Sequence, residues 1–309
     1  MEQPGSALAS LSGNPLTIVA MTSLARRAVF VTAVVGCAAP WGAASQIRPG
    51  IAVPPALSWS ARADQLLDAG DPSAALEALA PVLGEAPTPE ALWRAARAEY
   101  QQGILATDQD SANAWYRHAV VHAEAALEAA GDHPEALRWA VAANGSVANA
   151  PGVGPRETAR TARRAWELTR RLLEVAPDDP VAHSAMGSLH AEVLTMNFFE
   201  KILAKAILGD MVGGARWDDA LDHHRRAVEL DGATVLYRLE LGKALGWHGD
   251  LAGARTALAA ALALRPRTPL DRVHQEAARS WLGTFGGQVP GGVADGEDPR
   301  ERDPGVRPR

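Results

Sequence analysis

Two histidines at a spacing suited to metal binding are the first residues that could carry chemistry. His118 and His122 lie four positions apart, which would place both side chains on one face of a helix, as in helical zinc sites. The residues between them are Ala-Val-Val, so the glutamate base of a helical metalloprotease motif is missing, and no third ligand is apparent. We therefore predict that the chain binds no metal ion.

A short glycine-rich segment is the second candidate for chemistry. Gly152-Val153-Gly154 precedes a predicted helix, but it follows no strand and lacks the lysine of a P-loop, so we predict a loop and not a phosphate site. No nucleophile, base and orienting residue can be assembled from the remaining sequence. We predict no cofactor and no catalytic activity.

Charge and cysteine content exclude two further classes of protein. The 309 residues carry a formal net charge of -6, which gives no general basic field for a phosphate backbone and argues against nucleic acid as the main partner. The single cysteine, Cys37, excludes an internal disulfide framework and a cysteine-rich zinc site.

The segment Val235–Thr268 contains one complete helical repeat. Helical repeats of this kind would therefore position the residues of any binding site. Leu241-Gly242 lies in a first predicted helix, Gly249-Asp250 in the turn, and Ala254 in a second helix that ends before Pro266. Small residues at these positions let two antiparallel helices approach closely, which is the tetratricopeptide pattern. Such a hairpin cannot bury its apolar face alone, so we expect further copies beside it.

Four further units are expected before this one, starting near Trp59, Glu90, Leu137 and His183. We predict an all-α fold over residues 56–285: a tetratricopeptide-like superhelix of about five hairpins, with an inserted helix in the fourth and a capping helix at the C-terminal end. Residues 46–55 are predicted to be a linker, and residues 286–309, rich in Gly, Pro, Asp and Arg, to be disordered.

The first helices of successive units line the concave face of such a superhelix, so their residues form the predicted groove for a protein or peptide partner. Among them, Arg94 and Arg97 could bind a carboxylate or a phosphate, or form structural ion pairs. The candidate groove residues are Trp93, Arg94, Arg97, Tyr100, Trp139, Asn144, His183 and His190.

The inserted helix in the fourth unit is dense in apolar residues. This helix is expected to be buried or to meet a partner. If it is buried, Phe198, Phe199 and Ile202 either pack against the neighbouring repeat or line an apolar cavity, with Lys201 near a lipid headgroup. A phospholipid-binding module is therefore the alternative to a peptide-binding scaffold.

Residues 1–45 have the layout of an export signal, with an expected start at Met21, arginines, and a short apolar run followed by small residues. Val-Val-Gly before Cys37 resembles a lipobox, which would tether the mature protein through a lipid on that cysteine. We expect an exported, periplasmic or lipid-anchored protein that meets a membrane only through this leader or its lipid. A mitochondrial address is the alternative for a eukaryotic source.

The stretch from Ala91 to about Phe285 resembles the regulator of microtubule dynamics family, whose members carry an irregular tetratricopeptide domain. The residues that carry the resemblance are Leu92 to Arg97, Ala176 to Pro180, Phe199-Glu200-Lys201 in the inserted helix, and Leu241-Gly242-Lys243. The resemblance implies the irregular repeat fold. It also implies a link to microtubules and, in one branch of the family, to membrane contact sites and phospholipid binding.

Overall fold

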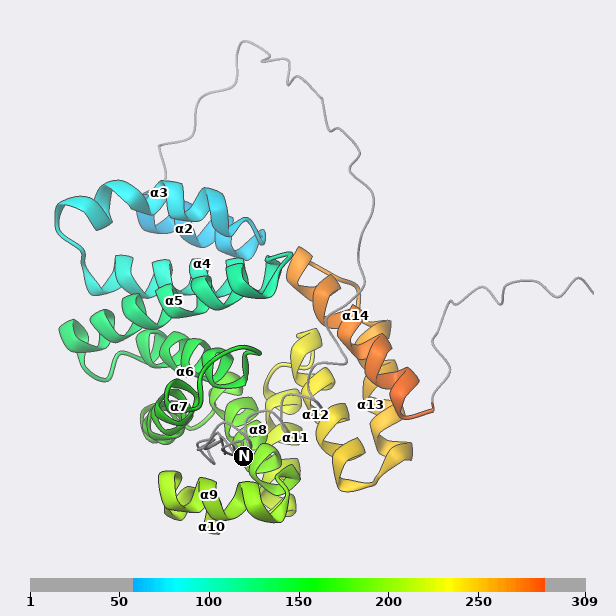
Figure 1. Ribbon diagram of the computed structural model, residues 1–309. Coiled ribbons are helices and arrows are strands. Elements are labelled where there is room, and N and C mark those ends of the chain that lie inside the picture. The colour runs from blue at the N-terminus through cyan, green and yellow to red at the C-terminus, as the bar shows by residue number, and fades with distance from the viewer. Residues whose placement is uncertain (1–57, 287–309) are drawn as a thin grey trace, which may run out of the picture.

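The computed structural model describes residues 58–286, and within this part of the chain every regular element is a helix (Figure 1). Helices pair as antiparallel hairpins that stack in order, which confirms the predicted tetratricopeptide-like superhelix. The hairpins are α2 (Trp59–Asp68) with α3 (Pro72–Glu85), α4 (Pro89–Leu105) with α5 (Gln109–Ala130), α6 (Pro134–Asn149) with α7 (Pro155–Val175), α8 (Pro180–Thr195) with α11 (Trp217–Leu230), and α12 (Val235–His248) with α13 (Leu251–Ala263).

The fourth hairpin carries the predicted insertion, which forms α9 (Phe198–Leu208) and the short α10 (Asp210–Gly213) between its two long helices. The predicted C-terminal cap is α14 (Pro269–Thr284). None of the described helices combines the length and the apolar composition needed to cross a bilayer. The predictions for the leader, Met21, Cys37, the linker and the tail beyond Gly286 lie outside the described residues and stay predictions.

Repeated sequence signals start these helices. An Asp or Thr caps most first turns and a proline often follows it, because a proline at the first helical turn loses no hydrogen bond. Asp71, for example, accepts from the backbone N–H of Ala74 at 3.1 Å, directly before Pro72. At α14 the cap is reciprocal: Thr268 accepts from the N–H of Asp271, whose carboxylate accepts from the N–H of Thr268.

Removing this capping box should destabilise the closing helix. We expect Thr268→Ala to lower the free energy of unfolding by about 1 kcal/mol, because one N-terminal donor of α14 loses its acceptor. Urea denaturation measures the change. A matched Thr256→Ala variant should have less effect, since the exposed Thr256 hydroxyl donates within its own helix to Ala252 and caps no terminus. Equal effects of the two substitutions would contradict a capping role for Thr268.

The helices of each hairpin meet at small residues, as the sequence pattern predicts. A Cβ atom built on Gly242 of α12 would lie 2.6 Å from Cγ of Leu258 in α13, closer than real contacts allow. Gly187 of α8 makes the same kind of contact with the ring of His224 in α11, at 2.7 Å. Larger residues at either position would push the paired helices apart.

The two ends of the described chain meet. Helix α14 packs on α12 and α13 and also contacts α4 of the second hairpin. The turn between α2 and α3 lies against the start of α14, because a Cβ on Gly70 would lie 2.7 Å from Cδ of Pro269. Figure 1 shows α14 spanning the space between the early and the late hairpins. The concave side is therefore bordered by α14 as well as by the first helices.

Candidate functional site

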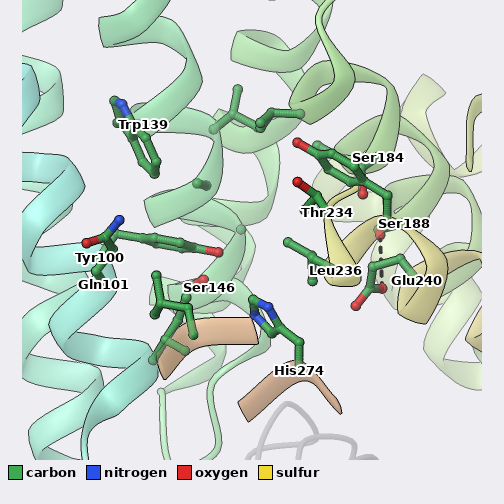
Figure 2. Close-up of a pocket in the computed structure, with 18 of the residues that line it drawn as sticks. Tyr100, Gln101, Trp139, Ser146, Ser184, Ser188, Thr234, Leu236, Glu240 and His274 are labelled. Atoms are coloured by element: carbon green, nitrogen blue, oxygen red, sulfur yellow. Dashed lines mark hydrogen bonds between the residues drawn. The ribbon is translucent and has the colours of Figure 1, made fainter. Parts of the chain in front are cut away.

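A cavity of about 620 Å³ occupies the concave side. Its walls come from the end of α2, from the first helices α4, α6, α8 and α12, from α7, and from α14. Figure 2 shows Tyr100 and Trp139 on one side, Ser184, Thr234 and Glu240 on the opposite side, and His274 of α14 between them. The site thus joins residues that are far apart in the sequence.

Aromatic side chains form one wall of the cavity. The ring centroids of Tyr100 and Trp139 lie 5.8 Å apart, and the guanidinium carbon of Arg97 lies 5.6 Å from the Trp139 centroid. Burial raises the pKa of Tyr100 to about 12, although a hydrogen bond with the Ser146 hydroxyl opposes the shift. Arg97 also forms an ion pair of 2.6 Å with Asp68. This wall offers ring faces, a protonated phenol and a neutralised cation.

The opposite wall is charged. The ammonium of Lys243 donates to both carboxylate oxygens of Glu240, at 2.9 and 2.8 Å, and the Ser188 hydroxyl lies 3.5 Å from the same carboxylate. Burial raises the pKa of Glu240, but the charge and hydrogen bond of Lys243 outweigh it, so the pKa is lowered. The pKa of His274 is lowered by burial, against the attraction of Glu240 and Asp271. Glu240 is therefore an ionised, paired carboxylate.

Three of the predicted groove residues line this cavity: Arg97, Tyr100 and Trp139. Trp93 and Arg94, on the same helix, do not. Arg94 donates to Asp64 at 2.8 Å and to Glu90 at 2.7 Å, with its guanidinium carbon 3.9 Å from the Trp93 ring centroid. Arg94 therefore ties the first hairpin to the second, as its structural interpretation predicts.

The other three predicted groove residues also lie outside the cavity lining. Asn144 is fully buried and donates to the Ala140 carbonyl at 2.9 Å. His183 lies with Nδ1 2.9 Å from Nδ1 of His223 and with Nε2 2.8 Å from the Pro177 carbonyl. His190 accepts from the Arg216 N–H at 3.3 Å and packs against Trp166. The two histidines therefore connect neighbouring helices, whereas Asn144 bonds within its own helix.

The sequence interpretation missed several residues that line the site. On α8 they are Val181, Ser184, Ala185, Ser188, Leu189 and Glu192, whose spacing of three and four marks one helix face. That periodicity could have identified them once the cavity face was known. His274 could not be identified in the same way, because it reaches the site through the contact of α14 with distant hairpins.

The two candidate metal ligands, His118 and His122, lie in different environments. His118 is exposed, whereas Nδ1 of His122 lies 2.8 Å from a carboxylate oxygen of the buried Glu99. This hydrogen bond raises the pKa of His122. Within residues 58–286, no group of three or more potential metal ligands comes together.

The inserted helix lies away from the cavity. Phe198, Phe199 and Ile202 are 72%, 74% and 55% exposed, so the expectation that they are buried against a repeat or in a cavity is wrong, whereas the alternative that this helix meets a partner stays a prediction. The ammonium of Lys201 donates to the Leu194 carbonyl at 3.1 Å, which fastens the start of α9 to the end of α8. The sequence of this helix could not show that the two phenyl rings are exposed, because it does not indicate whether another part of the chain covers them.

Comparisons with known proteins identify a family for most of the chain. A family model described as regulator of microtubule dynamics protein 1-3 matches residues 59–286. No curated protein sequence gives a significant match. Among solved structures, a thermophilic tetratricopeptide-repeat protein of Thermus thermophilus aligns at 20% identity and a TM-score of 0.49, over 71% of this chain and 96% of that one. MamA of Desulfovibrio magneticus aligns at 18% identity and a TM-score of 0.39, over 67% and 92%.

Proposed function

The chain belongs to the regulator of microtubule dynamics protein 1-3 family, and we propose that it is a non-catalytic scaffold. In this proposal, an extended segment of a protein partner binds in the concave cavity. The repeat fold supports an interaction role, since stacked hairpins expose a long concave surface. The specific partner segment and the cavity as its site are our proposal.

The observation that carries the proposal is the cavity itself. At about 620 Å³ it has the size of known ligand pockets, and each first helix from α4 to α12 contributes to it. The lining includes ring faces at Tyr100 and Trp139 and hydroxyls at Ser146, Ser184 and Thr234. Such a lining can accept apolar side chains and can hydrogen-bond to a peptide backbone.

The ionisable groups of the cavity support binding more than catalysis. With a pKa of about 12, Tyr100 stays protonated at neutral pH and keeps its hydroxyl proton as a donor for a ligand. Glu240 is held ionised by Lys243, which removes it as a proton acceptor tuned near neutral pH. These groups offer fixed charges and donors to a ligand.

Filling the cavity tests the proposal. Gly145 lies on α6 in the cavity wall, and a Cβ built there meets no atom within 4 Å, so Gly145→Phe should project a ring into the cavity without a clash. We expect it to weaken binding of a peptide selected from a displayed library by at least about tenfold, or roughly 1.4 kcal/mol. Fluorescence anisotropy measures the Kd, and thermal unfolding checks the fold.

Gly84→Phe is the matched control, because Gly84 is an exposed helical glycine outside the cavity whose Cβ also meets open space. It should leave the Kd unchanged. Peptides that bind the Gly145→Phe and wild-type proteins equally well would show that the cavity is not the peptide site.

A phospholipid or another apolar ligand is the second candidate for the same cavity. The observation in its favour is an apolar patch made by Leu67, Ile104 and Leu270. Native mass spectrometry of the purified protein distinguishes the two candidates. A phospholipid retained by the wild type and lost from Gly145→Phe would favour the lipid, and ligand-free protein that binds the selected peptide would favour the scaffold.

A further inference from the structure

The central turns of α6 and α8 present small side chains to the concave cavity. These helices follow one another between α4 and α12 along the concave side. A Cβ atom built on Gly145 meets no atom within 4 Å, so the space in front of this part of α6 is open. The small lining residues of the two helices are Ala142, Gly145, Ser146, Ser184, Ala185 and Ser188. The middle of the cavity therefore has room for a bulky group.

Ring-bearing side chains flank this space. On the α4 side are Tyr100 and, from α6, Trp139, with ring centroids 5.8 Å apart. On the α12 side is Tyr237, which lines the cavity and is 6% exposed. Aromatic rings attract one another in stacked and edge-to-face arrangements, in addition to the gain from burying their area. A planar side chain inserted between α4 and α12 would meet such rings.

Two hydroxyls of the cavity lining have no hydrogen-bond partner in the part of the chain that the structure describes. They belong to Ser184, which is 7% exposed, and to Tyr237. Burial raises the pKa of Tyr237, so its phenol stays protonated at neutral pH. A polar group that is buried without a hydrogen bond costs free energy, which a ligand atom of the right kind can restore. The two hydroxyls form the free polar end of the cavity.

The charged groups beside this space disfavour a charged ligand group. Glu240 is paired with Lys243 at 2.8 Å, and Asp68 with Arg97 at 2.6 Å. A charged side chain from a partner would have to displace one member of these pairs, and it would lose hydration on entering the cavity. A neutral side chain with one polar atom can bond to the free hydroxyls and leaves both pairs in place.

We propose that the partner segment anchors in the middle of the cavity with a tyrosine or tryptophan side chain, whose phenol or indole polar atom bonds to Ser184 or Tyr237. Both residues combine a large ring with one polar atom, which suits an apolar space with a polar end. A phenylalanine or leucine anchor would leave the hydroxyls without partners. The anchor rests on the proposed peptide-binding function and specifies the residue type that the partner supplies.

Peptide selection tests the anchor. Peptides from a displayed random library are selected on the wild-type full chain, and those that bind Gly145→Phe at least about tenfold more weakly are kept. We expect these cavity-dependent peptides to share a tyrosine or tryptophan at one position. Replacing that residue by alanine should raise the Kd at least about tenfold, because buried aromatic anchors are typical hot spots. Fluorescence anisotropy measures each Kd.

Removing one polar atom from the peptide isolates the hydrogen bond. On the wild type, a peptide with phenylalanine in place of an anchoring tyrosine should bind about twofold to tenfold more weakly. For a tryptophan anchor, benzothienylalanine removes the N–H in the same way. On Ser184→Ala/Tyr237→Phe the two peptides should bind equally. Tyr116→Phe is the matched control, because Tyr116 packs against Tyr100 but does not line the cavity, and it should keep the wild-type preference.

Two results would overturn the anchor and leave the cavity as the peptide site. One is a set of cavity-dependent peptides with no aromatic position that alanine weakens tenfold. The other is a preference for the polar ring that persists in Ser184→Ala/Tyr237→Phe. If no selected peptide depends on the cavity, the proposed function fails and the anchor fails with it. Thermal unfolding checks the fold of each variant, and the alanine scan on the wild type decides independently of them.

Discussion

Gly242→Val should lower the free energy of unfolding by about 3 kcal/mol, because the hairpin α12–α13 leaves no room for a side chain at this position. A Cβ would lie 2.6 Å from Cγ and 2.8 Å from Cδ2 of Leu258, and 3.4 Å from the Ala254 carbonyl oxygen. Leu258 is fully buried, so it cannot move aside into solvent. Urea denaturation measures the loss.

A double-mutant cycle with Leu258→Ala isolates the cause of this loss. Leu258→Ala alone should cost about 2–5 kcal/mol, because it leaves a cavity in the core. In that background Gly242→Val should cost much less than in the wild type, since its methyl groups enter the space that Leu258 leaves. Additive effects would show that steric overlap is not the reason. Gly84→Ala, on an exposed helix face, should instead stabilise the protein by up to about 1 kcal/mol.

Lowering the pH from 6.5 to about 4 should destabilise the protein through His224. Burial lowers the pKa of this fully buried histidine from 6.5 to about 4, so in this range the unfolded chain binds a proton that the folded chain does not. The stabilising contribution is complete above pH 6.5, falls as the pH decreases, and changes no further below about pH 4. The loss due to this residue is on the order of 3 kcal/mol.

His224→Leu should make the pH dependence shallower by this amount. The Nδ1 atom of His224 has no hydrogen-bond partner among the described residues, so an apolar side chain of similar size removes no bond at that atom. Some pH dependence should remain, because burial also lowers the pKa of His190, His223 and His274. Urea denaturation at several pH values gives the slope. His118→Gln, at an exposed histidine, is measured in parallel as the control for removing a histidine. An unaltered slope in His224→Leu would refute the assignment.

Local signals in the sequence predicted most of the fold. Small residues such as Gly242 and Ala254 marked where paired helices touch, and this prediction is confirmed. The insertion between α8 and α11 was predicted because the distance between repeat positions was too long for one hairpin. These signals come from residues that lie close together in the sequence, within a single hairpin, so the sequence alone is enough to recognise them.

The site was harder to predict because it depends on the relative rotation of the helices. Arg94 and Arg97 lie three residues apart on one helix, yet Arg94 pairs with Asp64 and Glu90 whereas Arg97 lines the cavity. His274 and Glu240 come together because α14 packs on α12, and they face Tyr100 only because α14 also contacts α4. The sequence left open whether Phe198 is buried or exposed, because an apolar sequence alone does not show whether a neighbouring surface is present to cover it.

The contact of α14 with α4 and with the Gly70 turn changes how this array responds to stress. A linear stack of hairpins frays from its ends, because a terminal unit is held by one neighbour and its loss leaves the others intact. Here the first and last units brace each other, so fraying at either end of the described chain must also break this seam. This contact couples the unfolding of the first and last units. A substitution that destabilises α14 should therefore also destabilise the first hairpin, which is the farthest from it in sequence.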